Sequence, residues 1–135
     1  MTTIVRRIGS VLLGFIVILL LVGVTDAILE KLFPAQFVKA DGSYAIPGLP
    51  LVAFIFGYVF VYAGVGGYLT ARIAPQSPLS HALVLGALLL LVSLAFALAN
   101  PQQQPLWYLA TSTVFVVLGC VVGGSLKARS ARAPA

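Results

Sequence analysis

The sequence predicts an all-α membrane protein, a four-transmembrane-helix bundle built from two tandem helical hairpins. Of the 135 residues, 61% are hydrophobic and only 8% are charged, and the mean hydropathy is +1.10. A soluble domain carries roughly 25% charged residues, because its surface must be hydrated. The apolar residues also fall into four long segments, and one eight-residue pattern occurs twice, at 65–72 and 122–129.

The four apolar segments span about 8–32, 51–73, 79–99 and 106–127. A helix needs ~20 residues to cross a hydrocarbon core ~30 Å thick, and each segment is long enough. Lipid cannot satisfy exposed backbone polar groups, so we expect helices. The strands of a membrane barrel would instead alternate in polarity over about ten residues, a pattern that is absent here. We therefore expect a single integral membrane domain over 1–135.

The boundaries of the first segment follow from the residues that flank it. It begins after two arginines and lacks a small-residue cleavage site beyond its apolar run, so we interpret it as a retained helix rather than a signal peptide. Pro34 is expected to end it, since proline removes a backbone donor and clashes with the preceding turn. The polar stretch 34–50 is predicted to be an outer loop.

The distribution of basic residues predicts the orientation. Four crossings place both termini on one side, together with Arg6, Arg7, Arg72, Lys127, Arg129 and Arg132, whereas Lys31 and Lys39 lie on the other side. Lysine and arginine are enriched on the cytoplasmic side of membrane proteins. Both termini are therefore expected to be cytoplasmic, with 128–135 as a basic cytoplasmic tail.

The repeated pattern is Val-Gly-Gly-x-Leu-x-Ala-Arg, and six of its eight positions are identical in the two copies. The copies lie at the C-terminal ends of the second and fourth segments, which run in the same direction. This arrangement predicts a parallel repeat of two hairpins, unlike the inverted repeats of many transporters. Small residues let helix backbones approach closely in lipid. The predicted helix-packing residues are Ala63, Gly66, Gly67, Ala71, Gly119, Gly123 and Gly124.

Asp26 and Glu30 are the candidate ion or proton site. They are four residues apart and so share one helix face. An ionisable side chain within a membrane segment suggests a function by default. The alternative is a hydrated helix end at the outer interface, where Lys31 neighbours Glu30.

Tyr58, Tyr62, Arg72 and Arg129 are the candidate lipid or ligand contacts. The tyrosines are one helical turn apart, and the arginines follow the two glycine pairs. The alternative is structural: the tyrosines pack against neighbouring helices, and each arginine lays its stem along its helix and anchors its head among lipid phosphates.

Several functional classes are not expected. The formal net charge is +5, but the basic residues lie at segment ends rather than on one folded face, so nucleic acid is not an expected partner. One histidine, His81, and one cysteine, Cys120, do not make a metal site. No catalytic constellation or phosphate-binding motif is present, so we expect neither an enzyme nor a cofactor.

One stretch of the chain resembles a known group of proteins. It is Gly66-Gly67-Tyr68-Leu69-Thr70-Ala71-Arg72-Ile73-Ala74-Pro75, followed by Pro78, His81 and Ala82. It resembles small four-helix bacterial integral membrane proteins to which no activity is assigned. The resemblance implies a bacterial inner membrane, and it carries over no functional residues.

The functional prediction is a small multi-pass membrane protein with a structural or interaction role, either an accessory subunit or a self-associating bundle. Its expected partners are the lipid bilayer and a second copy or another membrane protein. Two alternatives stay open. One is an oligomeric small transporter or channel with Asp26 and Glu30 at its outer mouth. The other is a lipid-binding or membrane-stress protein that uses its basic cytoplasmic rim.

Overall fold

The computed structural model describes residues 2–74, 76–100 and 104–131. The described part of the chain contains four long helices, α1 (Thr2–Leu32), α3 (Leu49–Ile73), α4 (Pro78–Ala99) and α5 (Leu106–Ser130), and one short helix, α2 (Pro34–Phe37). All four of the long helices have the length and the apolar composition needed to cross a membrane. The predicted all-α class with four long apolar helices is confirmed.

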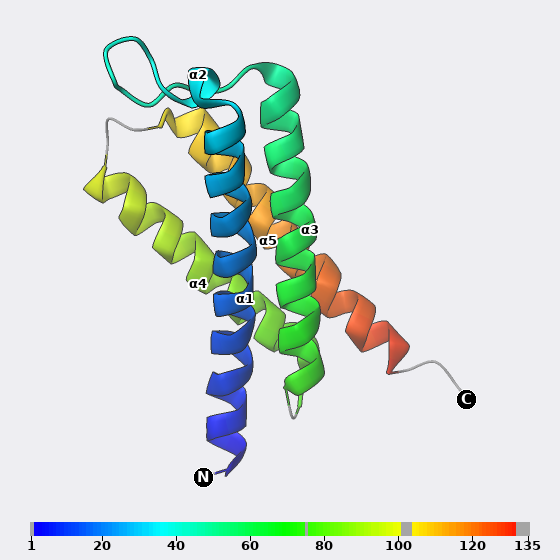
Figure 1. Cartoon of the computed structure of the whole chain (residues 1–135). Helices are drawn as coiled ribbons and strands as arrows, with labels where there is room; N and C mark the ends of the chain where they lie inside the picture. Colours follow the sequence, from blue (N-terminus) through cyan, green and yellow to red (C-terminus); the bar gives the residue numbers. More distant parts are fainter. Residues whose placement is uncertain (1, 75, 101–103, 132–135) are drawn as a thin grey trace.

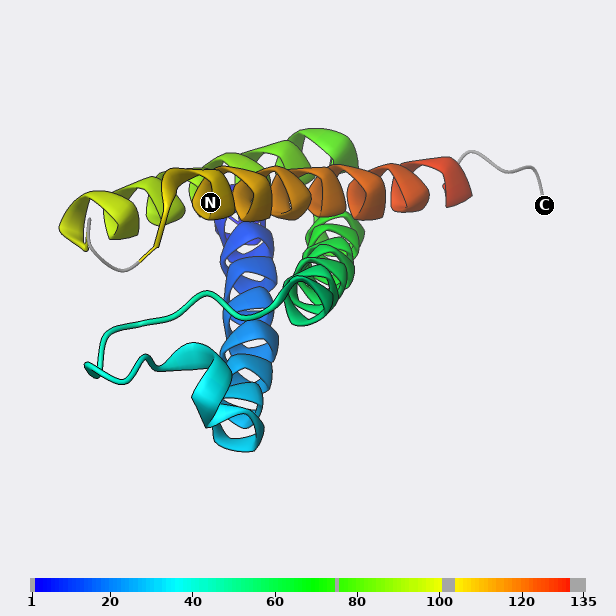
Figure 2. The ribbon, with the colours of Figure 1, turned by 90° about the horizontal axis from the view of Figure 1, so that it is seen from above.

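Two hairpins cross to form the bundle. In one layer α1 lies beside α3, and in the other α4 lies beside α5 (Figures 1 and 2). The N-terminal end of α1 and the C-terminal end of α5 lie at one end of the bundle, hereafter the terminal end. The loop of residues 33–48 lies at the opposite end, hereafter the loop end (Figure 1).

All four long helices extend beyond their predicted segments, α3 and α4 by one or two residues and α1 and α5 by more. Helix α1 begins at Thr2 rather than near residue 8, because nothing in Arg6-Arg7 breaks the helical ladder. Its 31 residues span ~46 Å, longer than a hydrocarbon core. Helix α5 continues to Ser130, with Lys127 and Arg129 in its last turn. Their positive charges interact favourably with the negative end of the helix dipole. Arg132 and the rest of 132–135 lie outside the described residues.

Glycines bring the backbones of α3 and α5 into direct contact. A Cβ atom built on Gly67 would lie 2.8 Å from Cys120 Cα, and one built on Gly123 would lie 2.8 Å from the carbonyl carbon of Gly64. Real Cβ atoms are essentially never found this close to backbone. At Gly119 the nearest side chain is Ala63 Cβ, also at 2.8 Å. The two helices could not approach this closely with larger residues.

The contact between α1 and α3 is also close and includes a buried polar group. A Cβ on Gly14 would lie 2.9 Å from the carbonyl oxygen of Gly66. Beside it, the fully buried Thr70 hydroxyl donates to the backbone oxygen of Ser10 over 3.1 Å. This bond satisfies a polar side chain that would otherwise be costly to bury.

The two Gly-Gly pairs are not used symmetrically. In the first pair, Gly66 faces α1 and Gly67 faces α5; in the second, Gly123 faces α3 and Gly124 faces Ala82 of α4. The first glycine of the pair therefore contacts a helix of its own hairpin in the first copy, where Gly66 meets α1. In the second copy it contacts a helix of the other hairpin, where Gly123 meets α3. An exact twofold axis would pair equivalent positions, so the tandem repeat stays a prediction from the sequence.

The loop end is organised by the segment between α1 and α3. The predicted loop 34–50 contains α2 and a single antiparallel bridge between Val38 and Tyr44, and its last two residues are already part of α3. Between them Gly42 adopts φ +79°, which glycine tolerates best. The Asp41 carboxylate accepts hydrogen bonds from the Ser43 amide and hydroxyl at 2.9 and 2.6 Å, and these bonds lower the pKa of Asp41. The tight turn directs Tyr44 back toward the helices.

Candidate functional site

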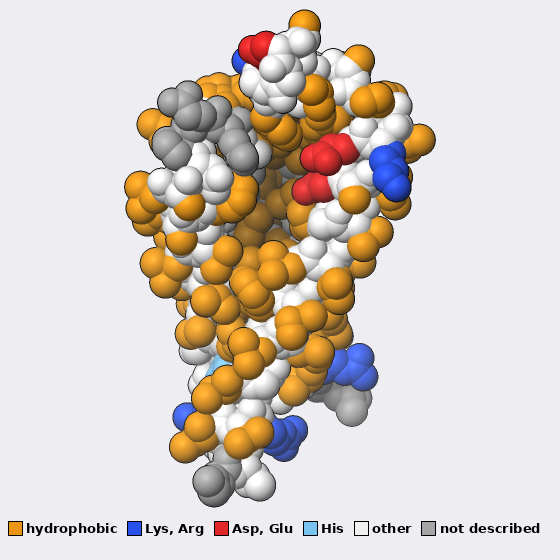
Figure 3. All heavy atoms as spheres, turned by 60° about the vertical axis from the view of Figure 1, so that its left-hand side comes forward, with side chains coloured by type: hydrophobic (Ala, Val, Ile, Leu, Met, Phe, Trp, Pro, Cys, Tyr) orange, Lys and Arg blue, Asp and Glu red, His pale blue; other side chains and the backbone are white. Residues whose placement is uncertain are grey.

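A cleft of about 790 Å³ opens on the side of the molecule near the loop end. Helices α1 and α4 form its two walls, α3 and α5 form its back, and the 37–44 segment covers its upper edge. Figure 3 shows the hollow beneath the loop, with two acidic side chains on one rim and apolar side chains within. We call this feature the α1–α4 cleft.

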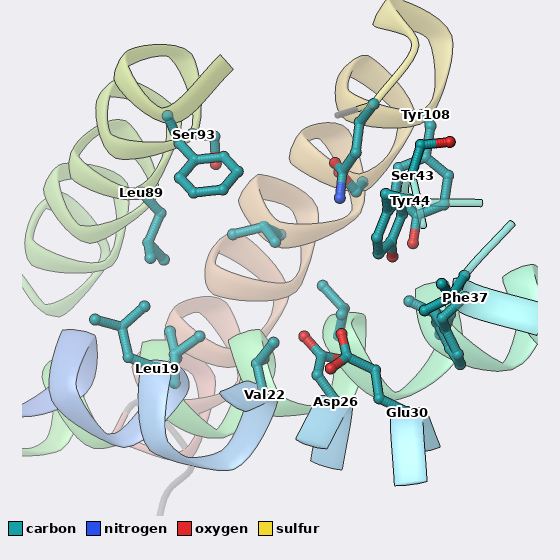
Figure 4. A pocket seen from close by; sticks show the side chains of 18 of the residues that line it. Leu19, Val22, Asp26, Glu30, Phe37, Ser43, Tyr44, Leu89, Ser93 and Tyr108 are labelled. Atoms are coloured by element: carbon teal, nitrogen blue, oxygen red, sulfur yellow. The ribbon is translucent and has the colours of Figure 1, made fainter. Parts of the chain in front are cut away.

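The polar groups of the cleft gather toward the loop end. Asp26 and Glu30 extend from α1, Ser93 from α4 and Tyr108 from α5 (Figure 4). Tyr44 approaches from the loop and faces the same space. The predicted pair Asp26 and Glu30 thus lies on a cleft wall, with Asp26 partly buried and Glu30 exposed.

Asp26 is held in place by α3. The Tyr58 hydroxyl, on a side chain that is 8% exposed, donates a hydrogen bond to the Asp26 carboxylate. One residue earlier, the Thr25 hydroxyl lies 3.1 Å from the Tyr62 hydroxyl and also donates to the Leu21 carbonyl oxygen. The tyrosines one turn apart on α3 therefore contact successive polar residues of α1. They fix the wall from which Asp26 and Glu30 project.

The floor of the cleft is apolar and densely packed. Ile18 of α1 and Leu89 of α4 line its inner end at 2% and 6% exposure. Leu85 and Cys120, both with no exposed surface, belong to the same cluster. Within the described residues, the polar lining does not continue past this cluster toward the terminal end.

The phenol of Tyr44, in the segment that covers the cleft, lies near the two carboxylates of the cleft. Burial raises the pKa of the Tyr44 phenol, and the nearby carboxylates of Glu30 and Asp26 raise it further, because a phenolate would be repelled by them. A hydrogen bond from Gln104 acts in the opposite direction.

We expect Glu30→Gln to move the pKa of Tyr44 downward, toward its ordinary value, because one repelling charge is removed. Carbon-13 NMR of tyrosine-labelled protein, with Tyr44→Phe to assign the signal, measures this shift. Asp41→Asn is the matched control, because it removes the remaining carboxylate of the loop end yet Asp41 does not line the cleft. Equal shifts in both variants would contradict a local effect of Glu30.

The four predicted lipid or ligand contacts do not form one site. Tyr58 and Tyr62 lie between α3 and α1, behind the wall of the cleft. Arg72 and Arg129 are exposed near the terminal end. Tyr58 and Arg72 are fourteen positions apart on α3, which corresponds to ~21 Å along the helix axis. The structure therefore separates the tyrosines from the arginines.

The predicted packing residues lie between helices. Ala63, Gly66, Gly67, Ala71, Gly119, Gly123 and Gly124 are all buried. Cys120 is buried among them with no exposed surface. Their positions suit the packing role that the sequence predicts for them.

Sequence reasoning missed several polar residues of the cleft, among them Ser93 and Ser112. Ser93 is a single hydroxyl residue in an apolar stretch of α4, whereas Ser112 stands between Thr111 and Thr113 in α5, and both serines line the cleft. The Ser112 hydroxyl donates to the Leu109 carbonyl oxygen over 3.0 Å, so it is satisfied within its own helix. The sequence offers only a weak signal, a lone serine in an apolar run for Ser93 and a Thr-Ser-Thr triplet for Ser112, because hydroxyl residues are ordinary in membrane helices.

The cleft combines a small set of polar groups with apolar side chains. Among the described residues, no three His, Cys, Asp or Glu side chains come together as they would around a metal ion. His81 lies on the first turn of α4, where its Nδ1 is 3.1 Å from the Ser77 carbonyl oxygen. The cleft therefore offers two carboxylates, hydroxyls and aromatic rings around an apolar interior.

Comparison with known proteins adds no assignment. The resemblance carried by residues 66–75 stays a prediction, as does the bacterial membrane that it implies. No family model, curated protein or solved structure matches this chain.

Proposed function

We propose that the protein is a non-enzymatic interaction protein of a bacterial inner membrane that binds an amphiphilic molecule in the α1–α4 cleft. The observation that carries this proposal is the cleft itself, a lateral opening of about 790 Å³ with an apolar interior and a polar rim. Small-molecule sites typically have volumes of ~300–1,000 Å³ and mostly apolar linings with a few polar groups. An amphiphile matches both parts of this surface.

The size of the cleft favours a small amphiphile over a helix of a partner protein. A helix with its side chains is ~10–12 Å wide, so three turns occupy on the order of 1,500 Å³. That volume exceeds the cleft by roughly a factor of two. A lipid chain or a compact apolar molecule fits without moving α1 away from α4.

The packing of the bundle supports a preformed site. The close contacts at Gly67 and Gly123 fix α3 against α5, and Gly14 fixes α1 against α3. The wall that carries Asp26 is tied to α3 through Tyr58. A site held in this way loses little conformational entropy when a ligand binds.

The orientation is part of the proposal. Arg6, Arg7, Arg72, Lys127 and Arg129 lie on the helix ends and turns of the terminal end. The positive-inside rule places that end in the cytoplasm. The cleft then faces the outer half of the bilayer.

A transporter or channel is the second candidate, and Asp26 and Glu30 at the rim of the cleft favour it. The packed cluster around Ile18 and Leu85 would have to open for passage through a single chain. A second copy could instead complete a pathway. Flux of a bound compound into liposomes, absent in Asp26→Asn with Glu30→Gln, would support transport over binding alone.

The test of the proposed function is to fill the cleft. Ser93→Trp places an indole in the cleft, whereas Ser93→Ala removes only the hydroxyl. The probe is the neutral methyl ester of a spin-labelled stearic acid, in protein reconstituted into zwitterionic bilayers. We expect Ser93→Trp to release about one motionally restricted chain per protein molecule and Ser93→Ala to release none. Equal restricted fractions in all three proteins, each folded by circular dichroism, would rule out the cleft as the site.

A further inference from the structure

Two of the three acidic residues in the entire chain face the α1–α4 cleft. The chain has only three Asp and Glu residues, and Asp26 and Glu30 both line this cleft. None of the described lining residues is Lys, Arg or His, although the chain contains eight Lys and Arg. Among the described residues that line the cleft, the formal charges are therefore of one sign.

The two carboxylates lie close together, and no cationic side chain of the described ranges pairs with them. They are separated by one helical turn of α1, and both extend into the cleft (Figure 4). The Asp26 carboxylate accepts from Tyr58, and no described residue forms an ion pair or hydrogen bond with Glu30. Like charges one turn apart repel, and clefts with low-dielectric walls strengthen the field of their charges. A cation in the cleft would relieve this repulsion.

Aromatic rings complete the surface around the carboxylates. Tyr44, Tyr108 and Phe96 line the cleft from the loop, α5 and α4. The face of an aromatic ring attracts a cation, most strongly where water is excluded. Carboxylates together with aromatic rings suit a large organic cation whose charge is bound to apolar groups. They do not suit a phosphate, which would meet negative charge without a cationic side chain to pair with.

We propose that the occupant of the α1–α4 cleft is a lipophilic organic cation. This inference rests on the proposed function, because it names the class of amphiphile that the cleft binds. The apolar body lies against Ile18, Leu89 and Val116, and the positive charge lies near Asp26 and Glu30. Neutral chains, zwitterionic lipids and organic anions are the competing occupants.

The experiment compares two probes of the same shape and opposite charge, tetraphenylphosphonium and tetraphenylborate. Equilibrium dialysis against the intact chain in zwitterionic nanodiscs, with empty nanodiscs subtracted, gives the affinity of each. We expect tetraphenylphosphonium to bind at least about tenfold more tightly than tetraphenylborate. Glu30→Gln should weaken cation binding by about tenfold, and Asp26→Asn with Glu30→Gln by more, because each change removes a charge from the cleft.

Two controls make the result specific. Asp41→Asn removes the same charge from the loop end but lies outside the cleft lining, so both affinities should stay unchanged. Asparagine can still accept the Ser43 hydrogen bonds of that turn. Ser93→Trp should abolish cation binding, which places the cation in the cleft.

The outcomes separate this inference from the proposed function. Equal or tighter binding of tetraphenylborate, or a preference for the cation that survives the double carboxylate variant, overturns the cation inference. If the neutral spin-labelled chain is still displaced by Ser93→Trp, the cleft remains a binding site and only its charge selectivity is wrong. If Ser93→Trp affects neither the chain nor the cation, both proposals fail.

Discussion

Gly67→Ala and Gly123→Ala are expected to lower the free energy of unfolding by about 1–3 kcal/mol each, the cost of overpacking a tightly packed core. The added methyl group would lie 2.8 Å from the backbone of the facing helix, at Cys120 Cα or at the carbonyl carbon of Gly64. Backbone atoms cannot rotate away as side chains can. Helices α3 and α5 must therefore move apart, and both lose packing along their contact.

Gly57→Ala is the matched control for these two variants. Gly57 also lies within α3, and a Cβ there would meet nothing within 4 Å. Alanine is the better helix former by up to ~1 kcal/mol, so the control should be neutral or stabilising. Reversible unfolding in mixed micelles, followed by circular dichroism, measures all three. A similar loss in Gly57→Ala and Gly67→Ala would show that the α3–α5 contact is not the cause.

Tyr58→Phe is expected to destabilise the attachment of α1 to α3 more than Tyr62→Phe does. Tyr58 donates to the carboxylate of Asp26, whereas Tyr62 pairs with the neutral hydroxyl of Thr25. Hydrogen bonds to charged groups contribute roughly 1.5–3 kcal/mol, and neutral ones roughly 0.5–1.5 kcal/mol. Both substitutions leave the aromatic ring in place, so the comparison isolates the two hydroxyl groups.

A double-mutant cycle between Tyr58→Phe and Asp26→Asn measures the coupling directly. Once the carboxylate has become a neutral amide, removal of the Tyr58 hydroxyl should cost less than it does in the native chain. The same unfolding assay in micelles gives the four free energies. If the two substitutions are additive, or if Tyr62→Phe costs as much as Tyr58→Phe, then the Asp26–Tyr58 bond does not anchor α1.

These predictions show how differently the fold and the site are encoded. Four helices follow from apolar segments, because lipid forces each such segment to satisfy its own backbone hydrogen bonds. Gly66, Gly67, Gly123 and Gly124 are visible as pairs in the sequence. Which helix each one faces is not, since a one-residue step rotates the facing direction by about 100°. In the structure, the glycine that faces the other hairpin is the second of the first pair, Gly67, and the first of the second pair, Gly123.

The candidate site was only half visible in the sequence. Asp26 and Glu30 stand out because ionisable residues are rare in apolar helices. Tyr44, Ser93 and Ser112 gave no comparable signal, because tyrosine at an interface and serine in a membrane helix are ordinary. Their role depends on the loop that returns Tyr44 to the bundle and on how α4 diverges from α1.

By itself, the sequence determined that this chain forms four long apolar helices, that close backbone contacts are available through its glycine pairs, and that two carboxylates share one face of the first helix. Only the tertiary structure decided that α1 and α4 separate near the loop end and leave a cleft of about 790 Å³ beside those carboxylates. The reason is physical. Hydropathy and periodicity are local properties of a segment, whereas a cavity depends on the angle at which distant segments cross.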